Sequence, residues 1–254
     1  MSDIYAFIKG KIVLKDDGSG LPRRGADVGI ERLLVNSGFV DKEERDGDIW
    51  GEIQDGAELP AGYSEHDRRG LWPLFDEKAF FRAGKAFHLM EWQRTHRYCG
   101  VCGARTLFDD KELAMRCPVC GELAFPVIAP AVIVAVEKDG KLLMGHGAAF
   151  PPGRFSVLAG FVEPGETLEQ CVEREVYEES KIRVKNIRYF ASQPWPFPRS
   201  LMAGFTAEWA GGEIEPDMTE VTEIRWFAAD ELPDYFRGLS ISCRLIEDFI
   251  RRHS

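Results

Sequence analysis

The residues best suited to chemistry are four glutamates within a stretch of fourteen residues: Glu166, Glu175, Glu178 and Glu179. If residues 167–180 form a helix, the last three occupy positions i, i+3 and i+4 and share one face. Like charges at this spacing repel one another unless a strongly positive ion lies between them. Carboxylate oxygens are the ligands that Mg²⁺ and Mn²⁺ prefer. The spacing therefore indicates a site for one of these divalent metals.

The segment before the expected helix is suited to a tight turn beside a ligand. Gly160, Pro164 and Gly165 let the chain turn sharply and bring its backbone close to a bound molecule. Thr167 is expected to cap the helix, or Glu166 to act as an acid of its first turn.

Arg174 is spaced to orient the carboxylates. It lies eight residues after Glu166 and four before Glu178, so one guanidinium can pair with both across successive turns. Such support is a normal requirement of an accurate metal site. A solvated acidic face is the alternative, since that is what most runs of charge are. The glycine turn and the register of Arg174 favour the metal site.

This stretch resembles the Nudix box, the sequence motif of the Nudix hydrolases. Lys181 departs from the motif, because it stands where the family has a glycine in the left-handed conformation after the helix. We expect this departure to cost on the order of 1 kcal/mol of stability and no metal ligand. The positions that match are Gly160, Glu166, Arg174, Glu175, Val176, Glu178, Glu179 and Ile182.

A second motif follows the box by ten residues and is rich in proline and aromatic residues. Three prolines stiffen it, Trp195 and Phe197 offer flat apolar faces, and other side chains offer hydrogen bonds. Such a loop suits a nucleotide ring and ribose, although composition alone would also fit a surface turn. The run resembles the motif that marks the NADH pyrophosphatase branch of the Nudix hydrolases. Its expected substrate-binding residues are Gln193, Pro194, Trp195, Pro196, Phe197, Pro198, Arg199 and Ser200.

Four cysteines form two pairs with the spacing of a zinc site. Cys99 and Cys102 make one knuckle, and Cys117 and Cys120 make the other after fourteen intervening residues. Four thiolates at this spacing suit tetrahedral Zn²⁺ in a closed, structural site. Two disulfides are the alternative, but the chain shows no sign of secretion, and reduced thiols are expected in the cytosol. We therefore predict structural zinc.

Length and composition fit a globular protein with more than one domain. The 254 residues are 44% hydrophobic, and no apolar run approaches the roughly 20 residues that span a bilayer. The N-terminus lacks a basic-then-apolar export signal, so we expect a cytoplasmic protein without membrane contact. A net charge of -10 argues against a broad nucleic-acid surface but not against recognition of one RNA end.

Apolar patterns predict an α+β N-terminal domain over residues 1–94 and a further domain of strands and helices over 127–254, with the cysteine knuckles between them over 95–126. The resemblance implies that the last domain is a Nudix domain and that the knuckles form a zinc ribbon. In the first domain we expect strands near 12–15 and 38–40 and a helix over 75–97. In the last we expect a hairpin turning at Asp139 and Gly140, with strands near 131–136, 141–144, 157–159, 184–191, 201–208 and 223–227, and a helix over 241–252.

The resemblance implies a fold and an activity. The fold is a mixed α/β Nudix domain, with a mixed sheet between helices, preceded by the zinc ribbon and the α+β domain. The activity is the use of water, with Mg²⁺ or Mn²⁺, to split NAD(H) into nicotinamide mononucleotide and AMP. The same cut on RNA with a 5′ NAD cap would leave a 5′ monophosphate. Enzymes of this branch resemble intertwined homodimers, so we expect a homodimer.

The resemblance also assigns roles to single residues. The Phe161 ring would stack on the substrate base with Phe125, which the partner subunit would supply. Either Glu179 or Glu175 would help to deprotonate the water, and Glu223 competes with Glu220 for the downstream acid. The expected catalytic acids, which would bind metal together with the Ala159 carbonyl, are Glu175, Glu178, Glu179 and Glu220. The residues expected to support this site are Gly160, Glu166 and Arg174. Further expected substrate contacts are Ser242, Glu112 and Arg69.

Two alternatives remain open at this point. The first is a Nudix hydrolase of another nucleoside diphosphate derivative, such as ADP-ribose or diadenosine polyphosphate. The second is a nucleotide- or RNA-binding module that does not cleave its ligand. The complete set of carboxylates argues against the second, because a sensor has no need of every metal ligand.

Overall fold

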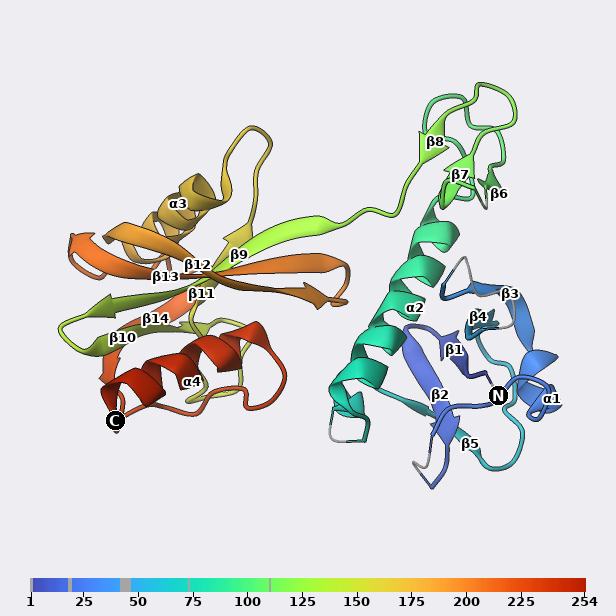
Figure 1. Ribbon diagram of the computed structural model, residues 1–254, viewed down its shortest axis with the longest axis horizontal. Helices are drawn as coiled ribbons and strands as arrows, with labels where there is room; N and C mark the ends of the chain where they lie inside the picture. Colours follow the sequence, from blue (N-terminus) through green and yellow to red (C-terminus); the bar gives the residue numbers. More distant parts are fainter. Residues whose placement is uncertain (1, 18–19, 42–46, 73, 110) are drawn as a thin grey trace. The chain divides into compact units, whose positions relative to one another are not determined.

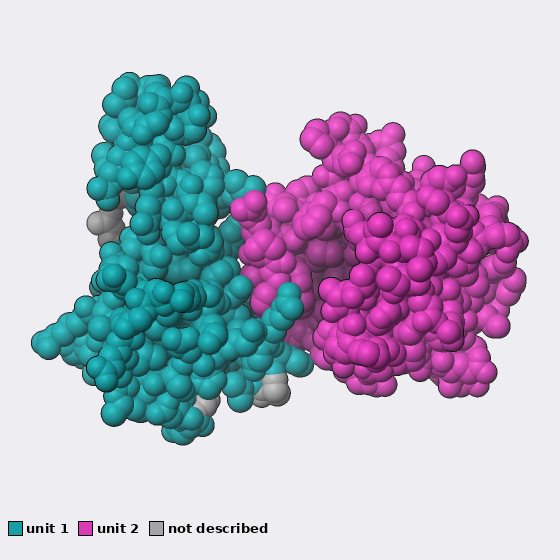
Figure 2. All heavy atoms as spheres, turned by 180° about the vertical axis from the view of Figure 1, so that it is seen from behind, with its two compact units in different colours: residues 1–127 teal, residues 128–254 magenta. Residues whose placement is uncertain are grey.

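The computed structural model describes residues 2–17, 20–41, 47–72, 74–109 and 111–254. The chain divides into two compact units, residues 1–127 and residues 128–254 (Figure 2). Further division of the first unit at residue 94 stays a prediction. None of the helices in the described segments is both long and apolar enough to cross a membrane.

The first unit contains a five-stranded sheet in the order β3-β4-β1-β2-β5, in which only β1 and β4 run parallel. The long helix α2 packs on β1 and β4, and its Phe87 ring lies 5.3 Å from that of Phe7. A second, three-stranded sheet, β6-β7-β8, follows α2 (Figure 1). The elements are β1 Ile4–Ile8, β2 Lys11–Lys15, α1 Val28–Glu31, β3 Leu34–Phe39, β4 Ile49–Ile53, β5 Tyr63–His66, the 3₁₀ helix η1 Arg68–Leu71, α2 Glu77–Thr95, β6 Leu107–Asp109, β7 Ala114–Arg116 and β8 Leu123–Ala124.

The second unit is built on a mixed sheet in the order β12-β13-β9-β10-β14, with β11 paired to β9. Strand β9 runs parallel to β13, and the other pairs are antiparallel. Asp139 and Gly140 both have positive φ in the β9–β10 turn, as expected of a tight hairpin. The elements are β9 Ala129–Lys138, β10 Lys141–Gly147, β11 Leu158–Phe161, α3 Leu168–Ser180, β12 Arg183–Trp195, β13 Ser200–Gly211, β14 Val221–Ala228 and α4 Ile241–His253.

Helices cover both faces of this sheet, α3 one face and α4 the other (Figure 1). Strand β9 therefore buries alternate residues on opposite sides. Val132 and Val134 pack with Val176 of α3, whereas Ile133 packs with Phe249 of α4. Because both faces are buried, residues 131–136 read as an unbroken apolar run. The predicted mixed sheet between helices is confirmed.

The helix that carries the carboxylates begins and ends as its sequence predicts. The hydroxyl of Thr167 accepts a hydrogen bond from the backbone N–H of Gln170, and the Gln170 side chain accepts one from the N–H of Thr167. This reciprocal cap fixes the first turn. The helix ends at Ser180, and Lys181 follows in the left-handed conformation, with φ 60°.

Replacing Lys181 by glycine is expected to raise the free energy of unfolding by about 1 kcal/mol. Glycine adopts the left-handed conformation without the steric cost that a Cβ imposes. Urea unfolding curves of the two proteins measure the difference. Lys181→Ala is the matched control, because it removes the ammonium group but keeps the strained backbone. An equal gain in both variants would contradict the backbone explanation.

Candidate active site and zinc centre

Arg174 binds three carboxylates at once. Its Nε and Nη2 donate to the two oxygens of Glu166 at 2.9 and 2.8 Å, and Nη1 donates to Glu175 at 2.9 Å and to Glu178 at 3.0 Å. Nη2 also donates to the carbonyl oxygen of Phe161 at 2.8 Å. The paired bonds from Arg174 hold the pKa of Glu166 down at about 2. One guanidinium thus links α3 to β11 and to the loop between β11 and α3.

Gly160 has a different role from the one expected of it. It lies in strand β11, paired with Val132, and does not form part of the turn. A Cβ at this position would lie 1.8 Å from the carboxyl carbon of Glu175, so any side chain there would displace that carboxylate. Gly165 does occupy the turn, with φ 93°. Gly160 therefore makes room for Glu175.

Glu179 is the most unusual acid of the group. Its side chain is 7% exposed, and Oε2 has no hydrogen-bond partner within the described part of the chain. Burial, together with the charges of Glu175 and Glu220, raises the pKa of Glu179 to about 8. Burial likewise raises the pKa of Glu175, which the guanidinium of Arg174 partly offsets. A buried, unpartnered oxygen among carboxylates fits a hard divalent cation.

Glu179 is expected to give the metal-free protein a pH-dependent stability. Its pKa in the folded chain is about 8, against an ordinary value of 4.5, so the folded state retains a proton that the unfolded state releases. The resulting stability is complete below about pH 4.5 and is lost as pH rises through 8. Between these pH values, the free energy of unfolding measured in chelator should fall by about 1.4 kcal/mol per pH unit more in the parent protein than in Glu179→Gln. Parallel pH profiles of the two proteins would contradict this.

The two candidates for the downstream acid have different surroundings. Glu220 is exposed, and its charge acts on both Glu175 and Glu179. Glu223 lies in β14 and forms an ion pair with Arg225. The charge of Glu220 therefore raises the pKa of both Glu175 and Glu179, and the choice between Glu220 and Glu223 as the downstream acid stays a prediction.

Asp217 is a neighbour of this group that the sequence analysis missed. Its charge also acts on Glu179, and its backbone N–H donates to the carbonyl oxygen of Glu179 at 3.2 Å. The local signal was an aspartate at the start of a turn, Asp-Met-Thr-Glu, which favours hydrogen bonds from the following backbone.

The Ala159 carbonyl, the expected backbone ligand of the metal, lies in β11, beside Gly160.

The proline-rich motif forms the closed end of the β12–β13 hairpin. Trp195 pairs with Ser200, and the Trp195 and Phe197 rings lie 5.1 Å apart. Pro196 is buried, while Pro194, Pro198 and Arg199 are exposed, and Ser200 is 7% exposed. The Phe197–Pro198 peptide bond is cis.

Gln193 lies inside the protein, and its expected contact with substrate stays a prediction. Its side chain is 3% exposed. Its Nε2 donates to the Leu239 carbonyl at 2.6 Å, and its Oε1 accepts from the Ile241 N–H at 2.8 Å. Because both ends of the amide are used within the fold, Gln193 fixes the start of α4. The hydroxyl of Ser242, in the first turn of α4, forms a hydrogen bond with that of Ser156, and the two oxygens lie 2.8 Å apart.

The remaining expected substrate contacts belong to different units. Phe161 is 57% exposed in the second unit. Phe125 is 49% exposed at the end of β8 in the first unit. Glu112 follows β6, with its N–H 3.4 Å from Asp109, and Arg69 lies in η1. The two aromatic rings are thus available for contact, each on its own unit.

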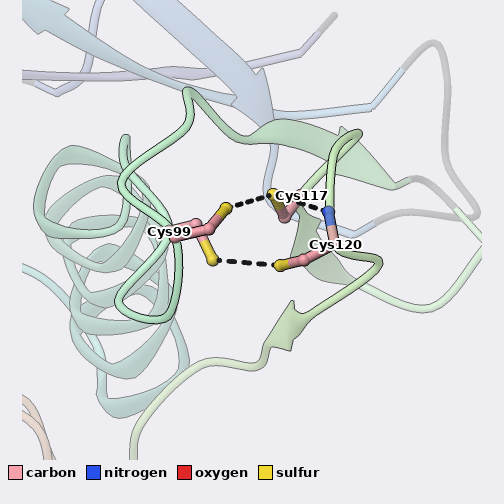
Figure 3. Close-up of side chains that lie close together, drawn as sticks. Cys99, Cys117 and Cys120 are labelled. Atoms are coloured by element: carbon pink, nitrogen blue, oxygen red, sulfur yellow. Dashed lines mark hydrogen bonds between the residues drawn. The ribbon is translucent and has the colours of Figure 1, made fainter.

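Two matching knuckles bring the four cysteine sulfurs together (Figure 3). In each, the first cysteine's carbonyl accepts from the N–H of a glycine with positive φ, Gly103 in one and Gly121 in the other. The sulfurs lie within 4.8 Å of one another. Sγ of Cys99 is 3.6 Å from that of Cys120, and Sγ of Cys102 is 3.4 Å from that of Cys117.

These distances fit a shared metal and exclude disulfides in this structure. A disulfide would place two sulfurs about 2.05 Å apart. Sulfurs that are each about 2.3 Å from one zinc in a tetrahedron lie about 3.8 Å apart. Backbone N–H groups of Val101 and Cys120 also point at sulfurs of Cys99 and Cys117, at 3.4 and 3.5 Å, as suits thiolates. The cluster therefore has the form of a closed zinc site.

Two family models match the chain. One, the NUDIX domain, matches residues 127–245, and the other, the NADH pyrophosphatase zinc ribbon domain, matches residues 94–125. The first covers the sheet, α3 and the carboxylates, and the second covers the four cysteines.

Similar proteins agree with these matches. The NAD-capped RNA hydrolase NudC of Pectobacterium carotovorum is 46% identical over 186 residues, 72% of this chain and 72% of that protein. The protein of the same name from Deinococcus radiodurans is 43% identical over 195 residues, 75% of this chain and 70% of that protein. A crystal structure of a NUDIX hydrolase from Nitrosomonas europaea has a TM-score of 0.53 and 25% identity, and covers 61% of this chain and 91% of that one.

Proposed function

Because the chain belongs to the Nudix hydrolase family, and within it to the proteins with an NADH pyrophosphatase zinc ribbon, we propose that it hydrolyses NAD(H) to nicotinamide mononucleotide and AMP. That it is a hydrolase of pyrophosphate bonds follows from the family. We propose in addition that the same cut removes the 5′ NAD cap of RNA and leaves a 5′ monophosphate. The names of the similar proteins support this second substrate.

The acidic face of α3 is the observation that carries the proposal. Glu175, Glu178, Glu179 and Glu220, with the Ala159 carbonyl, are the groups that would hold Mg²⁺ or Mn²⁺. Bound there, the metal would neutralise pyrophosphate oxygens and favour attack by water. Glu179 or Glu175 would accept a proton from that water, while Arg174 keeps Glu175 and Glu178 in orientation.

Substrate contacts in the proposal come from the hairpin end and from exposed aromatic rings. Trp195 and Phe197 would offer their faces to the dinucleotide, and Gln193 would act from inside by fixing the start of α4 near Ser242. Phe161 would stack on the base with Phe125 of the partner subunit. Because Phe125 would come from the partner subunit, we propose that the protein is a homodimer, and we also propose that it is cytoplasmic. Sedimentation velocity tests the dimer.

Product analysis tests the proposal. Purified protein is incubated with NADH and, in parallel, with ADP-ribose or diadenosine polyphosphate, each with Mg²⁺ or Mn²⁺ and with or without chelator, and the products are identified by mass. Metal-dependent release of reduced nicotinamide mononucleotide and AMP is the expected result. Intact NADH beside cleaved ADP-ribose or diadenosine polyphosphate would move the chain to another substrate. Binding of NADH without cleavage would instead indicate a ligand-binding module. RNA with a 5′ NAD cap, treated in parallel, should gain a 5′ monophosphate.

A further inference from the structure

Residues 217–221, which lead into the first residue of β14, form a turn organised by one side chain. Oδ1 of Asp217 accepts hydrogen bonds from the backbone N–H groups of Thr219, Glu220 and Val221 at 3.0, 3.1 and 2.9 Å. Its Oδ2 accepts from the Thr219 hydroxyl at 2.7 Å. These bonds use about as many acceptor positions as a carboxylate has, so Asp217 has little capacity left to bind a metal.

The turn is fastened to the end of the helix that carries the other acids. The N–H of Asp217 donates to the carbonyl oxygen of Glu179 at 3.2 Å, and the N–H of Glu215 donates to that of Ser180 at 3.0 Å. The turn closes where the N–H of Met218, with φ 62°, donates to the carbonyl of Val221 at 3.1 Å. The backbone of Glu220 is therefore fixed relative to Glu179.

The place of Glu220 depends on this turn and on the end of strand β10. The N–H of Ala148, which follows that strand, donates to the carbonyl oxygen of Glu220 at 2.9 Å, and Gly147 pairs with Val221. Glu220 is exposed, so burial does not hold its side chain, yet its charge acts on Glu175 and Glu179. A flexible, exposed side chain reaches a fixed partner only if its backbone is fixed. The hydrogen bonds that Asp217 accepts from the N–H groups of Glu220 and Val221 supply that restraint on one side, and the bond from Ala148 supplies it on the other.

We propose that Asp217 is a positioning residue of the hydrolytic site, which shapes the turn that presents Glu220 to the carboxylates of α3. The inference rests on the proposed function, because it takes Glu220 as an acid of the site. It predicts that most of the effect of Asp217 on catalysis passes through Glu220.

A double-mutant cycle between the two positions tests the inference. We compare the full-length protein with Asp217→Ala, Glu220→Gln and the double variant, and measure kcat and KM for NADH at saturating Mg²⁺, and Tm. In the parent background, Asp217→Ala should lower kcat by about 10 to 100-fold. In the Glu220→Gln background, the same change should lower kcat by less than about twofold. Tm should fall equally in both.

Asp217→Asn is the conservative control. Its remaining oxygen can still accept from the three N–H groups of the turn, so kcat should stay within about threefold of the parent protein. If Asp217→Ala fails to fold, Asp217→Ser takes its place in the cycle, because its hydroxyl can accept from fewer of these groups.

Three results would overturn the inference: equal loss of kcat in both backgrounds, unchanged kcat in Glu220→Gln, or a loss in Asp217→Asn as large as that in Asp217→Ala. Failure of the proposed function would give a different experimental result. If the parent protein cleaves ADP-ribose and leaves NADH intact, the substrate is wrong, and the same cycle measured on ADP-ribose decides the role of Asp217.

Discussion

Glutamine in place of Glu179 is expected to lower kcat for NADH by about a thousandfold and to leave dinucleotide affinity nearly unchanged. The side chain is 7% exposed and one of its oxygens has no hydrogen-bond partner within the described residues, so its charge is costly to the fold. An amide of the same shape removes that cost but is a poorer ligand for Mg²⁺ and cannot accept a proton. The variant should therefore be inactive yet at least as stable as its parent without metal.

Steady-state kinetics with NADH, equilibrium binding of NADH and thermal unfolding in chelator measure the three parts of this prediction. Glu173→Gln is the matched control, because it removes the same charge from an exposed position of the same helix. It should keep full activity. Cleavage by Glu179→Gln within about tenfold of the parent rate would refute the assigned role of Glu179, whose expected contribution is far larger.

Local signals explain why the second unit was predictable. Helix α3 was identified from its cap and from the spacing of its acids, both of which lie within the helix or next to it. The strands from β9 onward were located because buried runs alternate with turn residues such as Asp139 and Gly140. Strand β1, Ile4–Ile8, is not among the predicted strands; β2 next to it is its antiparallel partner, but its parallel partner β4 lies more than forty residues later. No local pattern specifies such a pairing.

The candidate site was predictable in composition but not in every role. Within the protein, the hydrogen-bond partners of Gln193 are Leu239 and Ile241, and no spacing within the motif reveals them. Gly160 was expected to permit a turn, whereas the structure shows it making space for Glu175, fifteen positions away. Asp217 escaped notice because its effect passes through backbone bonds. The residue types thus indicate the chemistry, whereas tertiary contacts determine which residues position the others.

Loss of one zinc ligand is expected to have the largest effect on the structure. Structural zinc contributes on the order of 10 kcal/mol or more to the folding of small modules. The three short strands β6, β7 and β8 have little core of their own, since Leu107, Phe108 and Val119 are exposed. Cys117→Ser should therefore abolish zinc binding and unfold residues 97–125, while the second unit, with a separate core on each face of its sheet, stays folded.

Metal analysis and limited proteolysis test this expectation, because the unfolded segment should be cut rapidly while residues 128–254 resist. Cys243→Ala is the control: it also removes a buried cysteine, but one in α4, so zinc content should stay at one per chain. Full zinc content and protease resistance in Cys117→Ser would contradict the four-cysteine site. Disulfides in the parent protein would contradict it as well, since a closed zinc site requires all four sulfurs as thiolates.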